Sequence, residues 1–309
     1  MAHNEDTRLP SQARIILGTS SWTFEGWRDV FYRREVRRDE WLGEYARHFV
    51  SVEVNTSFYA LPTPGTLIRW VESVPPGFSF ALKFPRRITH EARLVDCRAD
   101  TVAFLDVLDA LGEAAGPALL QLPPSLSRRS DGRNLARYVD ELAELLARRT
   151  AALKAGNQGR VAVEVRAPDL MTPAFARFLD ERGFSLTVVD RTGTPDIYPV
   201  WREGGARARF VYVRWIGDDR NGPKGDRAVV APRDAELVRW RDRIVELVDD
   251  GVDVYGYMHN PYEGHAPASV RRLGELLAAC GLSPRWPAQP EASGEPVRPA
   301  GTEDQLRLL

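Results

Sequence analysis

The sequence contains few cysteines and no long apolar segment. Its two cysteines, Cys97 and Cys280, lie far apart and lack CxxC or Cys/His spacing, so neither a disulfide framework nor a zinc finger is indicated. No apolar run approaches the roughly 18 residues that a membrane-spanning helix requires. The N-terminus also lacks the apolar segment of a signal peptide. We therefore expect a soluble cytoplasmic protein.

An excess of either charge is also missing. The 309 residues include 42 basic and 43 acidic side chains, which argues against a generally basic nucleic-acid binder and against a polyacidic tail protein. Lysine is rare: only Lys83, Lys154 and Lys224 occur, and all other basic residues are arginines. A coding bias towards arginine explains this skew, but it makes each retained lysine a residue to examine.

Apolar residues make up 43% of the chain, enough to fill a large core, and their pattern predicts the fold. Eight short apolar runs read as strands: 14–19, 50–55, 79–84, 117–122, 161–166, 185–190, 210–215 and 253–259. Helical periodicity lies between most of them, for example over 41–49, 135–146 and 237–248, and Thr172-Pro173 marks a helix start. Between Asp190 and Phe210, glycine, proline and arginine leave little room for a helix.

This alternation predicts a single-domain (β/α)₈ TIM barrel over residues 14–282. An open, doubly wound sheet fits less well, because no glycine-rich fingerprint follows the first strand. Residues 1–13 are expected to form a flexible N-terminus. Residues 283–309 are expected to form a disordered tail, since 283–302 is rich in Pro, Gly, Ala and Glu.

Polar residues near the strand ends predict a functional site, because barrel active sites lie at the C-terminal ends of the strands. Strands two to eight each carry such residues on alternating positions: Glu53 and Asn55, Lys83, Gln121, Glu164 and Arg166, Asp190, Tyr212 and Arg214, and His259. Neighbouring loops add Ser20, Trp22, Tyr59, His90, Asn260 and His265. The alternative is a network of ion pairs that only fills the barrel mouth.

A divalent metal is a further alternative that the sequence leaves open. His90, Glu53, Glu164, Asp190, His259 and His265 are suitable ligand types, but no HxH or HExxH pair occurs. The sequence also has no Walker loop, dinucleotide fingerprint or nucleophile elbow, so nothing indicates ATP, NAD, pyridoxal phosphate or a serine hydrolase. The cofactor therefore stays unknown at this point.

Several motifs resemble one known family, called domain of unknown function 72 or YecE-like. They span about residues 14–282 and include Gly18-Thr19-Ser20-Ser21-Trp22, Val52-Glu53-Val54-Asn55, Phe80-Ala81-Leu82-Lys83-Phe84-Pro85, Leu120-Gln121-Leu122-Pro123-Pro124, Glu164-Val165-Arg166 and Gly264-His265-Ala266-Pro267. The resemblance implies a TIM barrel and supplies no particular reaction. It leads us to expect two asparagines where this chain has His259-Asn260.

The last five residues suggest a docking peptide. Gln305, Leu306, Leu308 and Leu309 put an apolar tip on a polar tether, which is similar to the peptides that dock on bacterial DNA sliding clamps. The alternative is a terminus that packs on its own barrel or has no role.

These observations favour an enzyme that uses acid–base chemistry on a small polyhydroxylated or phosphorylated substrate, as a hydrolase, lyase or isomerase. Glu53, Lys83, Glu164 and Asp190 are the predicted catalytic residues, with Glu53 or Glu164 as the base and Lys83 or Arg166 stabilising negative charge. Lys83 could also act as a Schiff-base nucleophile. Substrate-binding residues are predicted to be Ser20, Trp22, Asn55, Tyr59, His90, Gln121, Arg166, Arg214, His259, Asn260 and His265. One alternative is a DNA-maintenance protein or phosphodiesterase that the tail recruits to the clamp, and the other is a ligand-binding barrel without catalysis.

Overall fold

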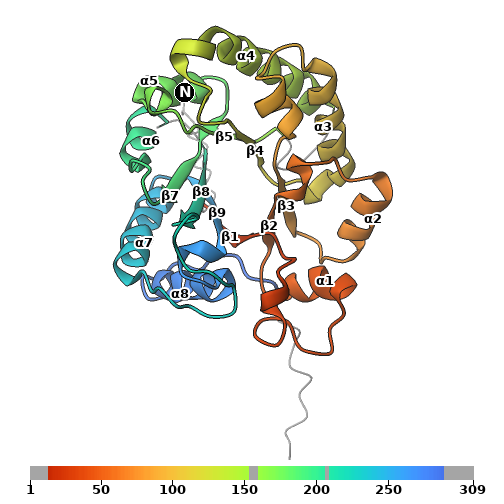
Figure 1. The fold of residues 1–309 in the computed structure, drawn as a ribbon, viewed down its shortest axis with the longest axis vertical. Helices are drawn as coiled ribbons and strands as arrows, with labels where there is room; N and C mark the ends of the chain where they lie inside the picture. The colour runs from red at the N-terminus through yellow and green to blue at the C-terminus, as the bar shows by residue number, and fades with distance from the viewer. Residues whose placement is uncertain (1–12, 153–158, 206–208, 289–309) are drawn as a thin grey trace, which may run out of the picture.

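Parallel strands form the centre of the molecule and helices surround them (Figure 1). The computed structural model describes residues 13–152, 159–205 and 209–288. The strands of this described part are β1 (Ile15–Ser20), β2 (Ser51–Val54), β3 (Ser79–Leu82), β4 (Ala118–Gln121), β5 (Val161–Glu164), β6 (Ser185–Leu186), β7 (Val188–Arg191), β8 (Phe210–Gly217) and β9 (Asp253–Met258).

The strands close into a barrel, as the sequence predicted. Hydrogen bonding orders them as β3-β2-β1-β9-β8-β7 and β4-β5-β6. Two backbone hydrogen bonds join β3 to β4: Phe84 N donates to Leu119 O (2.9 Å) and Gly116 N to Phe80 O (2.9 Å). The second junction between the two groups lies at β6 and β7, which only Thr187 separates. The sixth predicted strand, 185–190, thus forms both β6 and β7 and connects the two groups. The open-sheet alternative is therefore wrong.

The helices cover the outside of the barrel (Figure 1). They are α1 (Trp41–Tyr45), α2 (Pro64–Glu72), α3 (Arg98–Leu111), α4 (Arg128–Ala152), α5 (Pro173–Asp180), α6 (Tyr198–Gly204), α7 (Asp234–Asp249) and α8 (Ala266–Ala278). The predicted start of α5 is confirmed, because the Thr172 side chain accepts a hydrogen bond from Phe175 N (3.2 Å). The expectation of no helix between Asp190 and Phe210 is wrong: α6 forms there, with Trp201 buried.

Side chains inside the barrel lie in layers. The central layer is apolar and aromatic, and it consists of Ile16, Ala81, Leu119, Ala162, Phe210, Tyr212, Tyr255 and Tyr257. Alternate residues of a strand point to the same side, so the inward positions two residues further along belong to the barrel mouth. Those positions hold Lys83 after Ala81, Gln121 after Leu119, Glu164 after Ala162 and Arg214 after Tyr212. The sequence thus places an apolar floor directly below a polar mouth.

Ion pairs close the opposite end of the barrel. Arg14 donates from Nε to Asp253 Oδ2 (3.0 Å) and from Nη2 to the Tyr255 hydroxyl (3.1 Å). Arg160 Nη2 lies 3.2 Å from the same Asp253 oxygen. The side chains of residues before β1, before β5 and in β9 therefore seal the N-terminal end.

The expected boundary of the tail at Ser283 needs a correction. Arg285 N donates to Ile15 O (2.8 Å), and the Trp286 ring lies 6.2 Å from that of Phe49. Residues 283–288 thus pack on the barrel. Residues 1–12 and 289–309, which include the predicted docking peptide, lie outside the described residues, as does Lys154. In the described part, no helix combines the length and apolar character needed to cross a bilayer.

Gly18 tests the close packing of β1 against β2. A Cβ atom at this position would lie 2.1 Å from the carbonyl oxygen of Ser51, which is backbone and cannot turn away. We expect Gly18→Ala to lower the free energy of unfolding by about 1–3 kcal/mol, measured by urea denaturation. Gly65→Ala, where the nearest atom is 3.8 Å away at the end of a flexible arginine, is the control and should be neutral to slightly stabilising, because Gly65 lies in α2. A Gly18→Ala protein as stable as the wild type would contradict this packing.

Candidate active site

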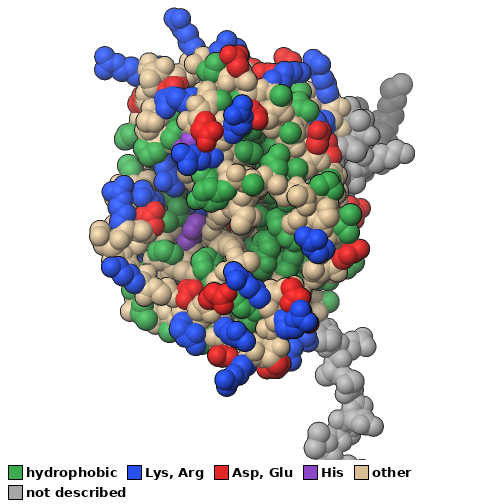
Figure 2. All heavy atoms as spheres, turned by 45° about the vertical axis from the view of Figure 1, so that its right-hand side comes forward, with side chains coloured by type: hydrophobic (Ala, Val, Ile, Leu, Met, Phe, Trp, Pro, Cys, Tyr) green, Lys and Arg blue, Asp and Glu red, His purple; other side chains and the backbone are tan. Residues whose placement is uncertain are grey.

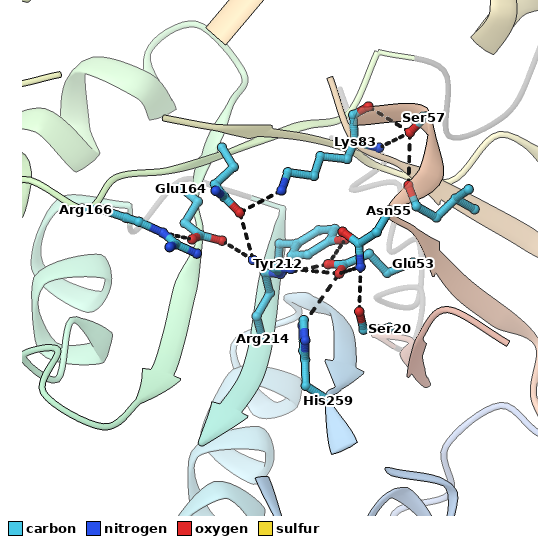
Figure 3. Close-up of polar contacts among 12 residues, drawn as sticks. Ser20, Glu53, Asn55, Ser57, Lys83, Glu164, Arg166, Tyr212, Arg214 and His259 are labelled. Atoms are coloured by element: carbon cyan, nitrogen blue, oxygen red, sulfur yellow. Dashed lines mark hydrogen bonds and ion pairs between the residues drawn. The ribbon is translucent and has the colours of Figure 1, made fainter. Parts of the chain in front are cut away.

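Arg214 lies at the centre of the barrel mouth and binds two buried glutamates (Figure 3). Its Nε and Nη2 each donate to one oxygen of Glu53, both at 2.8 Å, and its Nη1 donates to Glu164 Oε2 at 2.5 Å. Arg214 is 3% exposed, and the two glutamates are 0% and 1% exposed. Since a guanidinium presents a planar fork of donors, it can hold both carboxylates at once.

Other donors occupy the remaining oxygen positions of the two glutamates. Glu53 accepts from the Tyr212 hydroxyl (2.9 Å) and from Asn55 Nδ2 (3.1 Å). Glu164 accepts from Arg166 Nε (2.9 Å). Neither carboxylate therefore has an oxygen that lacks a hydrogen-bond donor.

The charges around these glutamates keep them ionised. Burial alone would raise the pKa of Glu53, but the Arg214 guanidinium outweighs this and lowers it to about 2. The pKa of Glu164 is lowered in the same way: burial opposes ionisation, and Arg214 and then Arg166 overcome it. A fully hydrogen-bonded carboxylate with a low pKa is a weak base. Glu53 and Glu164 are therefore ion-paired to Arg214 and fully hydrogen-bonded, and their catalytic role stays a prediction.

Lys83 is different, because no carboxylate of the described residues lies within ion-pair distance of it. Its Nζ donates to Gln121 Oε1 (2.9 Å) and lies 4.1 Å from the centre of the Phe58 ring. Burial, and next the positive charge of Arg214, lower the pKa of Lys83 to about 8. Both protonation states of this amine are therefore populated near neutral pH.

His259 adds a neutral imidazole to the mouth. Its Nε2 lies 3.5 Å from Glu53 Oε1, and this buried nitrogen has no hydrogen-bond partner among the described residues. Burial and then Arg214 lower the pKa of His259 to about 4, although Glu53 opposes the shift. The imidazole is thus neutral at pH 7 and forms part of the lining of the mouth.

A cavity of about 430 Å³ opens above these side chains. Its lining includes the predicted residues Asn55, Tyr59, Lys83, His90, Gln121, Arg166, Arg214 and His259. Tyr59 is 78% exposed at the rim, and His90 comes from a turn of π-helix over Arg87–Glu91 that follows β3. Ser20 lies next to this group, because its hydroxyl accepts from Asn55 Nδ2 (2.6 Å). Most of the predicted binding residues therefore meet in one place.

Asp190 does not join them. Its Oδ2 accepts from Trp240 Nε1 of α7 (2.7 Å) and from the Tyr262 hydroxyl (3.1 Å). Asp190 lies two residues after Val188, which belongs to the core between strands and helices, and it shares that outward face. The structure therefore does not bring Asp190 together with the other predicted catalytic residues, and its catalytic role stays a prediction.

Trp22, Asn260 and His265 make structural contacts outside the cavity. Trp22 packs edge to face on Trp70 of α2, with ring centroids 5.4 Å apart. Asn260 Oδ1 accepts from Ala266 N (2.9 Å) and so holds the first turn of α8. His265 directly precedes α8, and its ring lies 6.2 Å from that of Trp27. None of the three lines the cavity, so their predicted contact with substrate is not supported.

Sequence reasoning left several residues out of the site. The sequence places Tyr212 on the same strand face as Arg214 but gives it no role, and its hydroxyl donates to Glu53. Phe58 stands between two predicted residues in the loop after β2 and packs under Lys83. Arg86, Ile216, Asp219 and Pro261 also line the cavity. Arg86, Asp219 and Pro261 come from loops after strands, where no periodicity indicates the direction of a side chain.

The suitable metal ligands are dispersed. Within the described ranges, no group of three or more His, Cys, Asp or Glu side chains has the arrangement of a metal site. Glu53 and His259 are neighbours, but Arg214 stands between Glu53 and Glu164, and Asp190 and His265 lie in the wall. The mouth therefore combines arginine and lysine side chains with two ion-paired glutamates.

A family model described as "Protein of unknown function DUF72" matches residues 16–292. The chain belongs to the DUF72 family. This confirms the resemblance that its motifs carried.

Two curated DUF72 relatives differ in how much they share with this chain. The UPF0759 protein YecE of Escherichia coli (strain K12) is 43% identical over 115 residues, which is 37% of this chain and 40% of YecE. The chain thus matches less than half of the length of that relative. The UPF0759 protein YunF of Bacillus subtilis (strain 168) is 23% identical over 88% of this chain and 98% of its own length.

Solved structures agree on the DUF72 fold. A DUF72 family protein from Thermotoga maritima superposes with a TM-score of 0.68 at 23% identity, over 86% of this chain and 99% of that one. A D-psicose 3-epimerase from Clostridium cellulolyticum superposes with a TM-score of 0.50 at 13% identity, over 83% of this chain and 89% of that one. At such low identity these similarities show the fold alone, a TIM-like barrel.

Arg214 allows a test of the charge arrangement in this DUF72 protein. Replacing it by methionine leaves two buried carboxylates without their cation, so we expect Arg214→Met to lower the free energy of unfolding by about 3–5 kcal/mol at pH 7. Arg86→Met, which removes an exposed pair with Glu91, should cost about 1 kcal/mol or less. Urea denaturation measures both changes.

The same variant has a pH signature. In the wild type, the lowered pKa values of Glu53 and Glu164 contribute stability that is present above their unfolded pKa and is lost as the pH falls through their folded values. Without Arg214, burial raises the pKa values of both glutamates. Protonation then removes their buried charges, so the stability of the variant rises as the pH falls. The difference in stability between the two proteins should therefore shrink from pH 7 to pH 4.5. A constant difference would contradict the pairing.

Lys83 should titrate about two pH units below an ordinary lysine. We expect the rate of trace acetylation of Lys83, followed by mass spectrometry of its peptide, to have its midpoint near pH 8 in the folded protein, because burial and Arg214 disfavour the ammonium form. In urea the midpoint should return to about 10.4, the value of an unperturbed lysine. Equal midpoints in the two states would refute the shift.

Proposed function

We propose that this protein is an enzyme that transfers a proton on a small anionic, polyhydroxylated or phosphorylated compound, with Lys83 as the acid–base group. The observation that carries the proposal is the Lys83 amine, which faces the cavity with no carboxylate of the described residues within ion-pair distance and has a pKa lowered to about 8. A proton-transfer group works best when its pKa lies near the working pH.

The charge of the cavity supports an anionic substrate. Lys83, Arg86, Arg166 and Arg214 line it. Arg214 and Arg166 are paired with the buried Glu53 and Glu164, and the lining Asp219 pairs with Arg191 (2.9 Å). Lys83 and the largely exposed Arg86, 3.4 Å from Glu91, carry the remaining positive charge. Outside the mouth, basic and acidic side chains are interspersed over the face drawn in Figure 2. The concentration of positive charge in a recess suits a phosphate or carboxylate group, which arginine binds through two donors.

The remaining lining residues suit hydroxyl and carbonyl groups. Asn55, Gln121 and His259 offer amide and imidazole groups around the cavity. The Gln121 oxygen is held from two sides, by Lys83 Nζ (2.9 Å) and Arg214 Nη1 (3.3 Å). Fixed polar groups of this kind orient a substrate before reaction.

Isomerase or lyase chemistry fits this arrangement better than hydrolysis. Hydrolysis assisted by carboxylates needs an oxygen that is free to activate water. Here the oxygens of Glu53 and Glu164 bind Arg214, Tyr212, Asn55 and Arg166. One amine that gives and takes a proton can instead catalyse proton transfer next to a carbonyl group, while Arg166, whose side chain is 25% exposed, stabilises the negative charge that develops.

Recruitment to the DNA sliding clamp through Gln305, Leu306, Leu308 and Leu309 stays a prediction from the sequence. These residues lie outside the described part of the chain, and no observation at the barrel mouth favours this alternative. A ligand-binding barrel without catalysis is separated from the proposed enzyme by the following experiment.

Proton transfer can be detected without knowing the full reaction. We would incubate the protein in D₂O with dihydroxyacetone phosphate, fructose 6-phosphate, ribose 5-phosphate and glycerate, and follow loss of C–H signals by proton NMR. The wild type should exchange a proton of at least one compound. Lys83→Met should slow this by about 10²–10⁴-fold, the typical contribution of a general acid–base group. The rate should rise with pH around a midpoint near 8, because the neutral amine accepts the proton.

Lys224→Met is the matched control, since Lys224 is exposed in the loop between β8 and α7. Its exchange rate should equal that of the wild type. A compound that binds but never exchanges would support the ligand-binding barrel, and exchange at the wild-type rate in Lys83→Met would remove Lys83 from the reaction.

A further inference from the structure

The backbone of Lys83 is fixed, so its amine reaches the cavity from a rigid base. Lys83 N donates to the Ser57 hydroxyl oxygen (3.0 Å), and that hydroxyl donates in turn to the carbonyl oxygens of Lys83 (2.8 Å) and Val54 (2.9 Å). Ser57 is completely buried. The loop after β2 and the end of β3 are thereby joined at the Lys83 backbone, from which the side chain extends towards Glu164 (Figure 3).

Nζ of Lys83 is buried and has no salt bridge among the described residues. The side chain is 8% exposed, its hydrogen-bond acceptor is the uncharged amide of Gln121, and the Phe58 ring covers one side. The two nearby carboxylates are held by Arg214, which leaves no anion bonded to Nζ among the described residues. A lysine that only balanced charge would be expected to contact a carboxylate.

We propose that Lys83 is a nucleophile that forms an imine with the carbonyl carbon of a small aldehyde or ketone bearing an anionic group. This inference rests on the proposed function, because it uses the same amine and the same cavity, but Lys83 here makes the C–H proton acidic through an imine and does not remove that proton itself. Its geometric basis is an amine held at the bottom of a basic cavity, next to an uncharged acceptor and without a bonded carboxylate.

The step balances without an oxidant or a further reactant. The lone pair of the neutral Nζ attacks the carbonyl carbon, the C=O electron pair moves to oxygen, and a proton passes from nitrogen to that oxygen. The resulting carbinolamine loses its hydroxyl group with one proton as water, and a C=N bond forms. A protonated imine withdraws electrons from the neighbouring carbon, which makes its C–H proton easier to remove.

Two lining arginines, Arg166 and Arg86, could bind the anionic group of the substrate. Arg166 is 25% exposed, and Arg86, paired loosely with Glu91 at 3.4 Å, is 57% exposed. Both can bind a phosphate or carboxylate while the carbonyl carbon lies near Nζ. A cavity of about 430 Å³ is at the small end of ligand pockets, so phosphorylated sugars and keto acids of about three to six carbons suit it.

Borohydride trapping tests the imine directly. The full-length protein would be treated with sodium borohydride in the presence of dihydroxyacetone phosphate, glyceraldehyde 3-phosphate or pyruvate, and its intact mass measured. We expect one reduced adduct per chain with at least one probe, located on Lys83 by peptide mapping. With only three lysines in the sequence, the assignment is simple. Lys224→Arg should give the same adduct, and Lys83→Arg should give none.

Glycolaldehyde serves as the matched probe without an anionic group. Labelling of Lys83 at concentrations at least tenfold higher than for the anionic probes would agree with recognition by the arginines. Equal labelling of Lys83 and Lys224 by all probes would overturn the proposal, because it would mean non-selective reaction.

The outcomes of the two experiments separate the two proposals. Proton exchange in D₂O without any trapped adduct would refute the imine and leave Lys83 as a base. A trapped adduct on Lys83 without proton exchange would support the imine and refute the proposed proton transfer. Absence of both, in wild-type protein that unfolds cooperatively, would refute both.

Discussion

The bonding of Arg214 to Glu53 and Glu164 is the constraint on which the barrel mouth depends. Two buried carboxylates would each carry a large desolvation cost, and a single guanidinium offsets both through three short hydrogen bonds. Because Glu53 lies in β2, Glu164 in β5 and Arg214 in β8, these bonds also connect three separated strands across the barrel. The ion pairs that balance the buried charges therefore also hold the three strands of the mouth in place.

That network determines which groups remain for chemistry. The two glutamates are ionised and fully hydrogen-bonded, whereas Lys83 and His259 face the cavity with few or no polar partners. The mouth thus holds both features that the sequence allowed. Ion pairs fill the end of the barrel, and the Lys83 amine faces the cavity above them. Arg214 and the two glutamates, which balance charge, and Lys83, which can react, therefore belong to the same polar layer of the barrel mouth.

Much of this could be predicted from the sequence because strands have a simple period. In β2, β3, β4, β5 and β8 the alternation of polar and apolar residues indicated which side chains point inwards, and the structure confirms it for Glu53, Lys83 and Arg214. Asp190 was misplaced because Val188 and Val189 are both apolar, so the pattern did not distinguish the two faces. Asn260 and His265 follow a strand but serve the start of α8, and loop residues have no period that would reveal this. The pairing of Arg214 with both glutamates also could not be read from the sequence, because it depends on distances across the barrel.

The closure of the barrel has a consequence for how the chain folds. β1 pairs with β2 on one side and with β9 on the other, and Arg14 binds Asp253, 239 residues further along. During synthesis, one edge of the first strand therefore stays open until almost the whole barrel has left the ribosome. Contacts of such long sequence separation form slowly, and an unpaired strand edge is a site for mispairing with another chain. The edge of β1 that later pairs with β9 is thus a site where a nascent chain can mispair with another chain.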